Sequence, residues 1–215
     1  DPHMNYSCGF WESAQNLAEA QVAKMEMICA KLRLEPGMKV LDVGCGWGGL
    51  ARWMAGHHGV QVTGVTVSVE QAKLARDRCA DLPVDIEVRD YRELEGQFDR
   101  IVSVGMFEHV GQRNYQTFFS KTRSLLKDQG LFLLHTIGAG RDGFATDRWI
   151  EKYIFPNGVL PPAPALARQA GTFFTIEDWH NFGADYDPTL MAWYRNFNDA
   201  WPALKVHYGD RFKRM

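Results

Sequence analysis

Short apolar runs alternate with longer amphipathic segments along the first two thirds of the chain. The apolar runs are short enough to be buried strands, and they occupy residues 39–43, 60–67, 84–88, 98–104 and 130–137. The segments between them carry apolar residues at three- and four-residue intervals, which is typical of helices packed on a sheet. This alternation predicts an α/β fold with a mostly parallel sheet and helices on both of its faces.

Several helix boundaries are marked by residue type. The first helix is expected over 12–34, and Glu35-Pro36-Gly37 ends it. Ser68 and Gln71 have the spacing of a capping box, which predicts a helix start after the second strand. Later helices are expected around Leu50 and Met54, through Phe118, Thr122 and Leu125, and from Leu190 through Trp193, Phe197 and Ala200 to Leu204.

The pattern changes after the fifth strand. Residues 138–172 are rich in glycine, proline and aromatic residues, and the segment is too long for an ordinary connection. We expect a cap inserted over the ends of the strands. Residues 173–182 are predicted to form one more strand.

Composition narrows the class of protein. The 215 residues are 46% hydrophobic with a net charge of −2, which fits one catalytic domain over 1–215 and gives no general attraction to nucleic acid. Four scattered cysteines without metal-ligand spacing predict reduced thiols in a cytoplasmic protein with no metal. No apolar run is long enough to cross a bilayer, no signal peptide is expected, and residues 1–4 are interpreted as a cloning scar.

A glycine-rich loop follows the first strand. Gly44, Gly46 and Gly48 alternate with other residues directly before a helix, so backbone can approach a ligand closely. The dinucleotide fingerprint has a different spacing and an acid at the end of the second strand, where this chain has none. Asp42, just before the loop, suits the cationic amino group of S-adenosylmethionine. The plainer alternative is a tight strand–helix turn without a ligand.

Two titratable residues stand at strand ends, where open α/β sheets bind ligands. Glu108 follows the fourth strand and His135 lies within the fifth, at its cofactor-facing end. Each residue also has a purely structural explanation. Glu108 could be an acid that caps the next helix, and His135 could be a buried core histidine. The residues alone leave both alternatives open.

Much of the chain resembles one branch of the class I S-adenosylmethionine-dependent methyltransferases, the cyclopropane fatty acid synthases. The glycine loop lies in the first motif of that class. The other matching stretches are 6–11 (YSCGFW), 64–66 (GVT), 105–111 (GMFEHVG), 134–138 (LHTIG), 152–158 (KYIFPNG), 178–186 (DWHNFGADY) and 211–215 (RFKRM). The resemblance implies a Rossmann-like fold. It also implies that a family N-terminal helical domain and a final strand inside the sheet are absent from this chain.

The resemblance assigns residues to S-adenosylmethionine. Gly44 and Gly46 would pass under its methionine part, with Asp42 acting through water or by holding the loop. The ribose would be reached by Thr66, Val67 and Gln71, and the adenine flanked by Asp90 and Tyr91. Tyr6 and Ser7 would close over the carboxylate end. Gln71 has a structural alternative as part of the capping box, and Tyr6 as plain surface.

The resemblance also implies a bound bicarbonate ion as the catalytic base. The matching residues are Cys8, Glu108, His135, the backbone N–H of Ile137, and Tyr186. In this interpretation Glu108 and His135 relay a proton away from the ion, and Cys8 is a neutral hydrogen-bond partner rather than a nucleophile.

The implied reaction adds a methylene across a cis double bond of an unsaturated phospholipid acyl chain. Peripheral contact with the inner face of the membrane is expected, through Lys152 or the basic residues Arg211, Lys213 and Arg214, and a homodimer is a further expectation. Three alternatives remain: a related methyltransferase for another lipid or a small amine, a fragment that binds the cofactor without turnover, and a nicotinamide oxidoreductase.

Overall fold

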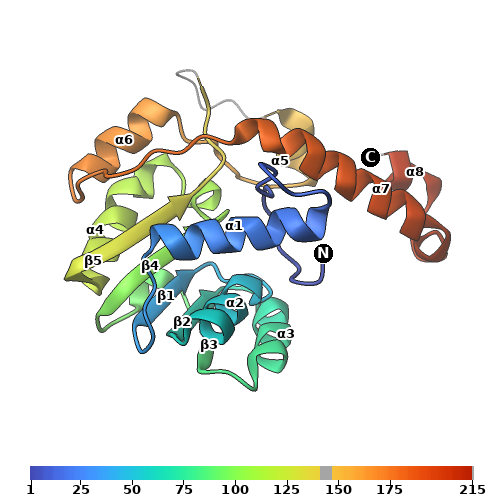
Figure 1. Ribbon diagram of the computed structural model, residues 1–215. Helices are drawn as coiled ribbons and strands as arrows, with labels where there is room; N and C mark the ends of the chain where they lie inside the picture. The colour runs from blue at the N-terminus through green and yellow to red at the C-terminus, as the bar shows by residue number, and fades with distance from the viewer. Residues whose placement is uncertain (141–146, 215) are drawn as a thin grey trace.

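A computed structural model of the protein describes residues 1–140 and 147–214. Five parallel strands form one sheet in the order β3-β2-β1-β4-β5 (Figure 1). Their bounds are β1 Lys39–Val43, β2 Gln61–Thr66, β3 Val84–Val88, β4 Phe98–Val104 and β5 Leu126–His135. Strand order reverses between β1 and β4, so loops that leave these two strands border the crevice in which such sheets bind ligands.

Helices cover both faces of the sheet, as the sequence predicts. The larger helices are α1 Leu17–Lys31, α2 Gly49–His58, α3 Val69–Cys79, α4 Tyr115–Leu125, α6 Ala163–Gly171 and α7 Tyr186–Leu204, with short α5 Arg148–Tyr153 and α8 Asp210–Arg214. The 3₁₀ turns are η1 Tyr91–Glu93, η2 Phe107–His109, η3 Gln112–Asn114 and η4 Gly183–Asp185.

Alternation along each strand divides the core into two layers. Val40, Val62 and Val102 pack against α1 and α2, whereas Leu41 and Ile101, on the opposite face, pack against α4. Strands buried on both faces explain why the sequence shows continuous apolar runs rather than alternation.

The predicted strand over 173–182 is wrong. The backbone N–H groups of Phe173 and Phe174 donate to the carbonyl of Ala170, which closes a turn after α6. Phe174 then packs on Phe132 of β5 with ring centroids 5.4 Å apart. Phe173 and Phe174 are therefore partly buried as side chains of a turn, whereas Ile176 and Trp179 further along the run are exposed.

Other boundaries also differ from the prediction, most of all at the starts of the first helix and the fifth strand. The first helix begins at Leu17 rather than residue 12, because Asn16 caps it by accepting a hydrogen bond from the Glu19 N–H at 3.0 Å. The fifth strand begins at Leu126 rather than residue 130, with an irregularity in its pairing opposite Phe98 and Arg100.

The segment after β5 holds α5 and α6. A bridge between Ala139 and Pro162 closes its base, and the N–H of Val159 donates to the Glu108 carbonyl at 2.8 Å. Residues 141–146 of the predicted cap lie outside the described residues. In Figure 1, α5 lies beyond the arrowhead of β5, on the side of the sheet where the strands end.

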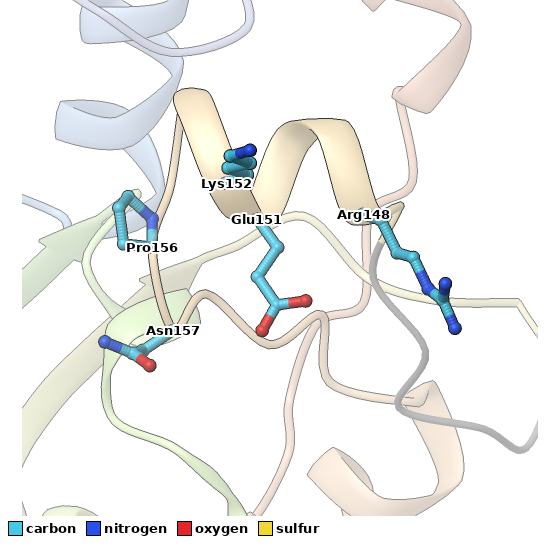
Figure 2. Close-up of a pocket in the computed structure, with 5 residues that line it drawn as sticks. All are labelled: Arg148, Glu151, Lys152, Pro156 and Asn157. Carbon is cyan, nitrogen blue, oxygen red and sulfur yellow. The ribbon is translucent and has the colours of Figure 1, made fainter.

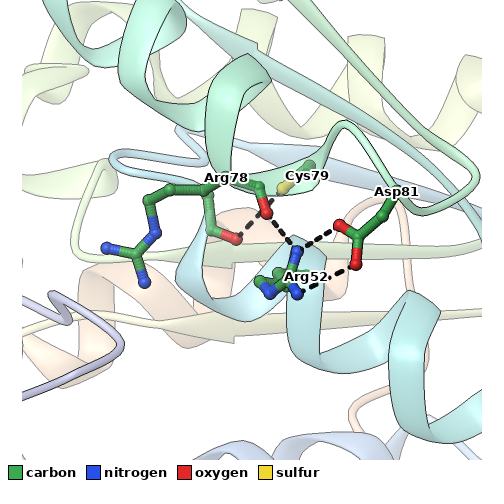
Figure 3. A network of polar contacts seen from close by, with 5 residues as sticks. Arg52, Arg78, Cys79 and Asp81 are labelled. Atoms are coloured by element: carbon green, nitrogen blue, oxygen red, sulfur yellow. Dashed lines mark hydrogen bonds and ion pairs between the residues drawn. The ribbon is translucent and has the colours of Figure 1, made fainter.

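A polar network joins α2 to the end of α3 (Figure 3). Arg52 donates to both carboxylate oxygens of Asp81, at 2.6 and 3.2 Å, and to the carbonyl of Arg78. The Cys79 thiol lies 3.8 Å from the carbonyl of Gly48 and donates to it. The helix that follows the glycine loop is thus fixed to its neighbour on the same face of the sheet.

Candidate functional site

The glycine loop leaves β1 with a backbone that only glycine adopts easily. Gly44 has φ +87°, and a Cβ there would lie 2.7 Å from the Cβ of Met106. Gly48, at φ +79°, packs against Ala75, so it serves the fold. Gly46 has φ +55°, and a Cβ there would meet no atom of the described residues within 4 Å. The surface at Gly46 is therefore open to a ligand.

Asp42 lies near the end of β1, two residues before Gly44, and is buried. Its Oδ2 has no hydrogen-bond partner in the described part of the chain. Burial raises the pKa of the carboxyl to about 7. A buried acid with an unpaired oxygen beneath a glycine loop fits the cationic group of a ligand.

The residues predicted for the ribose stand at the end of β2. The Thr66 hydroxyl donates to Gln71 Oε1 at 2.9 Å, and Ser68 Oγ accepts from the Gln71 N–H at 3.3 Å. Val67 is exposed. Only the Ser68 half of the predicted capping box is present, because the Ser68 N–H donates to Thr66 Oγ1 at 3.2 Å instead of to Gln71. The Gln71 side chain is held beside Thr66.

The residues predicted for the adenine have partners of their own. Asp90 accepts hydrogen bonds from Arg92, which lower the pKa of its carboxyl, and the shortest contact is 2.5 Å. Tyr91 packs edge-on against Phe118 with ring centroids 5.3 Å apart, and it is half-buried. Tyr91 keeps part of its ring accessible, whereas the Asp90 carboxylate is engaged by an arginine.

The N-terminal segment is held between α1 and α7. Ser7 is buried, and its Oγ accepts a hydrogen bond from Lys24 Nζ at 2.6 Å. Its carbonyl accepts from Gln21 Nε2 at 2.9 Å. Tyr6 is 63% exposed and stacks on Trp193 of α7, with ring centroids 5.0 Å apart.

Glu108 lies in η2, directly after β4, and is buried. Its Oε1 accepts from the N–H of Ile137 at 2.8 Å, while Oε2 has no partner among the described residues. The resemblance assigns the Ile137 N–H to bicarbonate, whereas the structure pairs it with Glu108. An N–H can be shared between two acceptors, so the two assignments are compatible.

His135, at the end of β5, presents a second unpartnered atom. Its Nδ1 is buried without a hydrogen bond within the described residues, and its ring lies 5.3 Å from that of Phe182. Burial, and then the charge of Lys24, lowers the pKa of His135 to about 4. The imidazole is therefore neutral at physiological pH and has one nitrogen that accepts.

Cys8 and Tyr186 complete the predicted set. Burial raises the pKa of the Cys8 thiol to about 11, so the sulfur is a neutral thiol. Burial also raises the pKa of Tyr186, at the start of α7, and the charge of Glu108 raises it further. Residues from four distant parts of the sequence thus gather at one place.

Sequence reasoning missed two residues that organise this place, Lys24 and Thr189. Both are buried, and Thr189 Oγ1 accepts from the Gly9 N–H at 3.1 Å and from Trp11 Nε1 at 2.8 Å. A signal for Lys24 existed, because Gln21 and Lys24 recur at helical spacing with the buried Leu17 and Ile28. No sequence pattern indicated the role of Thr189, because its partners Gly9 and Trp11 lie near the opposite end of the chain.

Neither a metal centre nor a membrane span is found in the described part of the chain. In residues 1–140 and 147–214, no group of three or more histidine, cysteine, aspartate or glutamate side chains is arranged to hold a metal ion. No helix in the same residues is long and apolar enough to cross a membrane. The four cysteines are free and buried.

The sheet order, the glycine loop and the site at the strand ends define the class I methyltransferase fold. The structure matches the cyclopropane synthase MmaA2 from Mycobacterium tuberculosis with a TM-score of 0.92 and 29% identity, over 99% of this chain and 81% of that one. It matches mycolic acid cyclopropane synthase CmaA1, in a complex with SAH and CTAB, with a TM-score of 0.91 and 31% identity, over the same shares.

The family follows from sequence. The family model described as mycolic acid cyclopropane synthetase matches residues 1–215, and the chain belongs to this family. It is 58% identical over 215 residues to the cyclopropane-fatty-acyl-phospholipid synthase of Escherichia coli strain K12. The match takes in 100% of this chain and 56% of that relative, so the chain spans little more than half of its length.

Proposed function

We propose that this domain adds a methylene across a cis double bond of an unsaturated phospholipid acyl chain, with S-adenosylmethionine as methyl donor and bicarbonate as base. One observation carries the proposal: Glu108 Oε2 and His135 Nδ1 are buried without partners in the described residues, beside neutral Cys8 and Tyr186. Unpaired buried polar atoms are costly, and a small polar ion that pairs with them removes the cost.

The donor set suits a small anion with both donors and acceptors. The thiol of Cys8 and the hydroxyl of Tyr186 are neutral groups that donate hydrogen bonds. The Glu108 carboxylate accepts one, so it suits the protonated oxygen of bicarbonate. When bound, bicarbonate supplies the base for the reaction. His135, neutral because of its burial, has a nitrogen that can hold a proton nearby.

The cofactor residues support the same proposal. S-adenosylmethionine, when bound, supplies an electrophilic methyl group. Asp42 would face its cationic end, Gly44 and Gly46 would lie along its methionine part, and Thr66 with Gln71 would hold its ribose through the pair at the end of β2. We assign Tyr91, rather than Asp90, the closer role at the adenine, because Arg92 already binds the Asp90 carboxylate.

The substrate side is aromatic. Attack of an alkene on a methyl group leaves a carbocation in the acyl chain, and aromatic faces stabilise cations. The transferred methyl then loses a proton to the base, and the ring closes to give a net gain of one methylene. Phe155 of the cap lies near both Tyr6 and His109, with ring centroids 6.1 and 5.9 Å apart. We assign these rings to the wall of the acyl slot, which makes residues 138–172 the substrate-side cap.

We also propose that α5 contacts the membrane surface. Trp149 and Ile150 are exposed beside Arg148 and Lys152, and aromatic with basic residues are the types that favour a lipid headgroup region. Figure 2 shows Arg148 and Lys152 directed away from each other on this helix, above a shallow polar hollow that Asn157 helps to line. The hollow contains none of the residues assigned to catalysis.

The test is direct. The protein at its natural full length is mixed with S-adenosylmethionine and vesicles of unsaturated phospholipid, and the lipids are analysed by mass spectrometry. The proposal predicts a gain of one methylene per modified chain and none in vesicles of saturated lipid. Cofactor binding by calorimetry without any lipid product would contradict it.

A further inference from the structure

Lys24 is a buried cation that has no counter-ion among the described residues. Its side chain lies on α1 and the residue is 2% exposed. Among the ion pairs within the described residues, none includes Lys24. Its one hydrogen bond there is to Ser7 Oγ, at 2.6 Å. Burial of an unpaired ammonium is strongly unfavourable.

The surroundings of Lys24 place it at the proposed anion site. Lys24 Nζ donates to the hydroxyl of Ser7, which directly precedes Cys8 in the chain, and the charge of Lys24 helps to lower the pKa of His135. Burial lowers the pKa of Lys24 to about 7. An anion near the ammonium would favour its charged form.

The residues assigned to the anion include no positively charged group. Glu108 is an acid, and a bicarbonate ion beside it brings a second negative charge into a buried place. His135 is neutral, and Cys8 and Tyr186 are neutral as well, so none of the residues assigned to the ion supplies a positive charge.

We propose that Lys24 is a positioning residue whose buried ammonium supplies the positive charge that lets bicarbonate bind beside Glu108. The inference rests on the proposed function and assigns a role to a residue outside the set implied by resemblance. A purely structural role explains the residue poorly, because Gln21 already holds Ser7 through its carbonyl and a neutral side chain could hold the hydroxyl.

The test is the effect of bicarbonate on thermal unfolding of the full-length protein, at fixed neutral pH and ionic strength. Lys24→Met keeps the length of the side chain and removes its charge. We expect bicarbonate to raise the midpoint of the wild-type protein. In Lys24→Met the bicarbonate concentration needed for the same rise should increase about thirtyfold or more, because the opposite charge is lost in a poorly solvated site.

Without bicarbonate, Lys24→Met should unfold at the same temperature as the wild type or higher, since a buried unpaired charge is replaced by an apolar side chain. One control isolates the charge. Lys31→Met removes a partly exposed lysine, paired with Asp178, from the same helix. It should retain the bicarbonate effect.

The inference is overturned if Lys24→Met responds to bicarbonate as the wild type does, or if the wild type does not respond at all. Its failure is separable from that of the proposed function. A bicarbonate effect that depends on Lys24, in a protein that adds no methylene to lipid, would leave this inference standing and refute the reaction.

Discussion

Glu108 has two oxygens in different situations, one bonded to the Ile137 N–H and one buried without a partner in the described residues. Glu108→Gln keeps an acceptor for the Ile137 N–H and removes the carboxylate. We expect methylene addition to fall about 100-fold or more, the usual range for loss of proton-transfer chemistry, while S-adenosylmethionine binds within about threefold of wild type. Calorimetry and lipid mass spectrometry measure the two effects.

The control is Glu95→Gln, the same substitution at an exposed position, which should alter neither quantity. Full turnover by Glu108→Gln would remove Glu108 from the proposed chemistry.

Asp42 links the site to stability. Its pKa rises from 3.8 to about 7 on folding, so the native state holds this proton more tightly than the unfolded chain does. The contribution to stability is therefore greatest below about pH 4, and it is lost as pH rises toward 7. Asp42→Asn cannot ionise, so it escapes this loss.

We expect Asp42→Asn to be more stable than the wild type at pH 8 by about 1–3 kcal/mol, and to show little or no gain near pH 4. Urea unfolding of the protein without cofactor, at the two pH values, measures the difference. If Asp42→Asn were more stable than the wild type by the same amount at both pH values, ionisation of Asp42 would not be the cause of the difference.

At the scale of elements, the loop after β1 requires glycine at position 44 for two reasons, its positive φ angle and the lack of room for a side chain. Gly44→Ala would place a Cβ 2.7 Å from Met106 at φ +87°. Gly96 has φ +95° with nothing within 4 Å, so Gly96→Ala isolates the conformational strain. Strain alone costs about 1–2 kcal/mol, and we expect Gly44→Ala to lose clearly more stability, as well as cofactor affinity.

Denaturant unfolding of the two variants, with cofactor titration of each, tests this. If Gly44→Ala and Gly96→Ala lost equal stability, the side chain of Met106 would have moved aside, and the close contact would not be a cause of the loss.

The junction between α7 and the N-terminal segment positions Cys8 next to Tyr186. Thr189→Val removes the acceptor for the Gly9 N–H and the Trp11 indole N–H. Leaving buried donors unpaired should cost about 2 kcal/mol or more and lower turnover further than stability alone explains. Thr122→Val in α4 also removes a buried hydroxyl, bonded within its own helix to Phe118, and should leave turnover unchanged.

The measurement is turnover at a temperature where both variants are folded. If Thr189→Val lost stability and kept its turnover, the junction would support the fold without placing Cys8.

Apolar runs and capping residues predicted the helices and strands well where only one assignment fits the local sequence. The runs 39–43, 84–88 and 98–104 are strands with those bounds, and Ser68 caps α3 as expected. Prediction failed where distant contacts decide. Asp185 of η4 accepts from the Trp11 N–H at 2.7 Å, a contact that no local sequence pattern indicates. Residues 127–130, which precede the predicted strand, lie in β5 between the paired residues Leu126 and Leu131, at an irregularity in its pairing with β4.

At the scale of the whole molecule, the site forms only when the fold brings four distant segments of the chain together. Cys8, Glu108, His135 and Tyr186 come from the N-terminal segment, η2, β5 and α7. Their residue types could be predicted from resemblance to a family, and their mutual effects on pKa come only from the fold. The effect of Lys24 on His135 also comes only from the fold, because helical spacing indicates that Lys24 is buried but not which residues lie near it.

The central claim is that the transferred methyl loses a proton after it reaches the lipid. S-adenosylmethionine with a CD₃ methyl group tests this when it is incubated with the full-length protein and unsaturated phospholipid vesicles. The account predicts a product that has gained one CD₂ unit, with two of the three deuterium atoms retained and the double bond lost. A product that keeps all three deuterium atoms would identify simple methyl transfer and contradict the account.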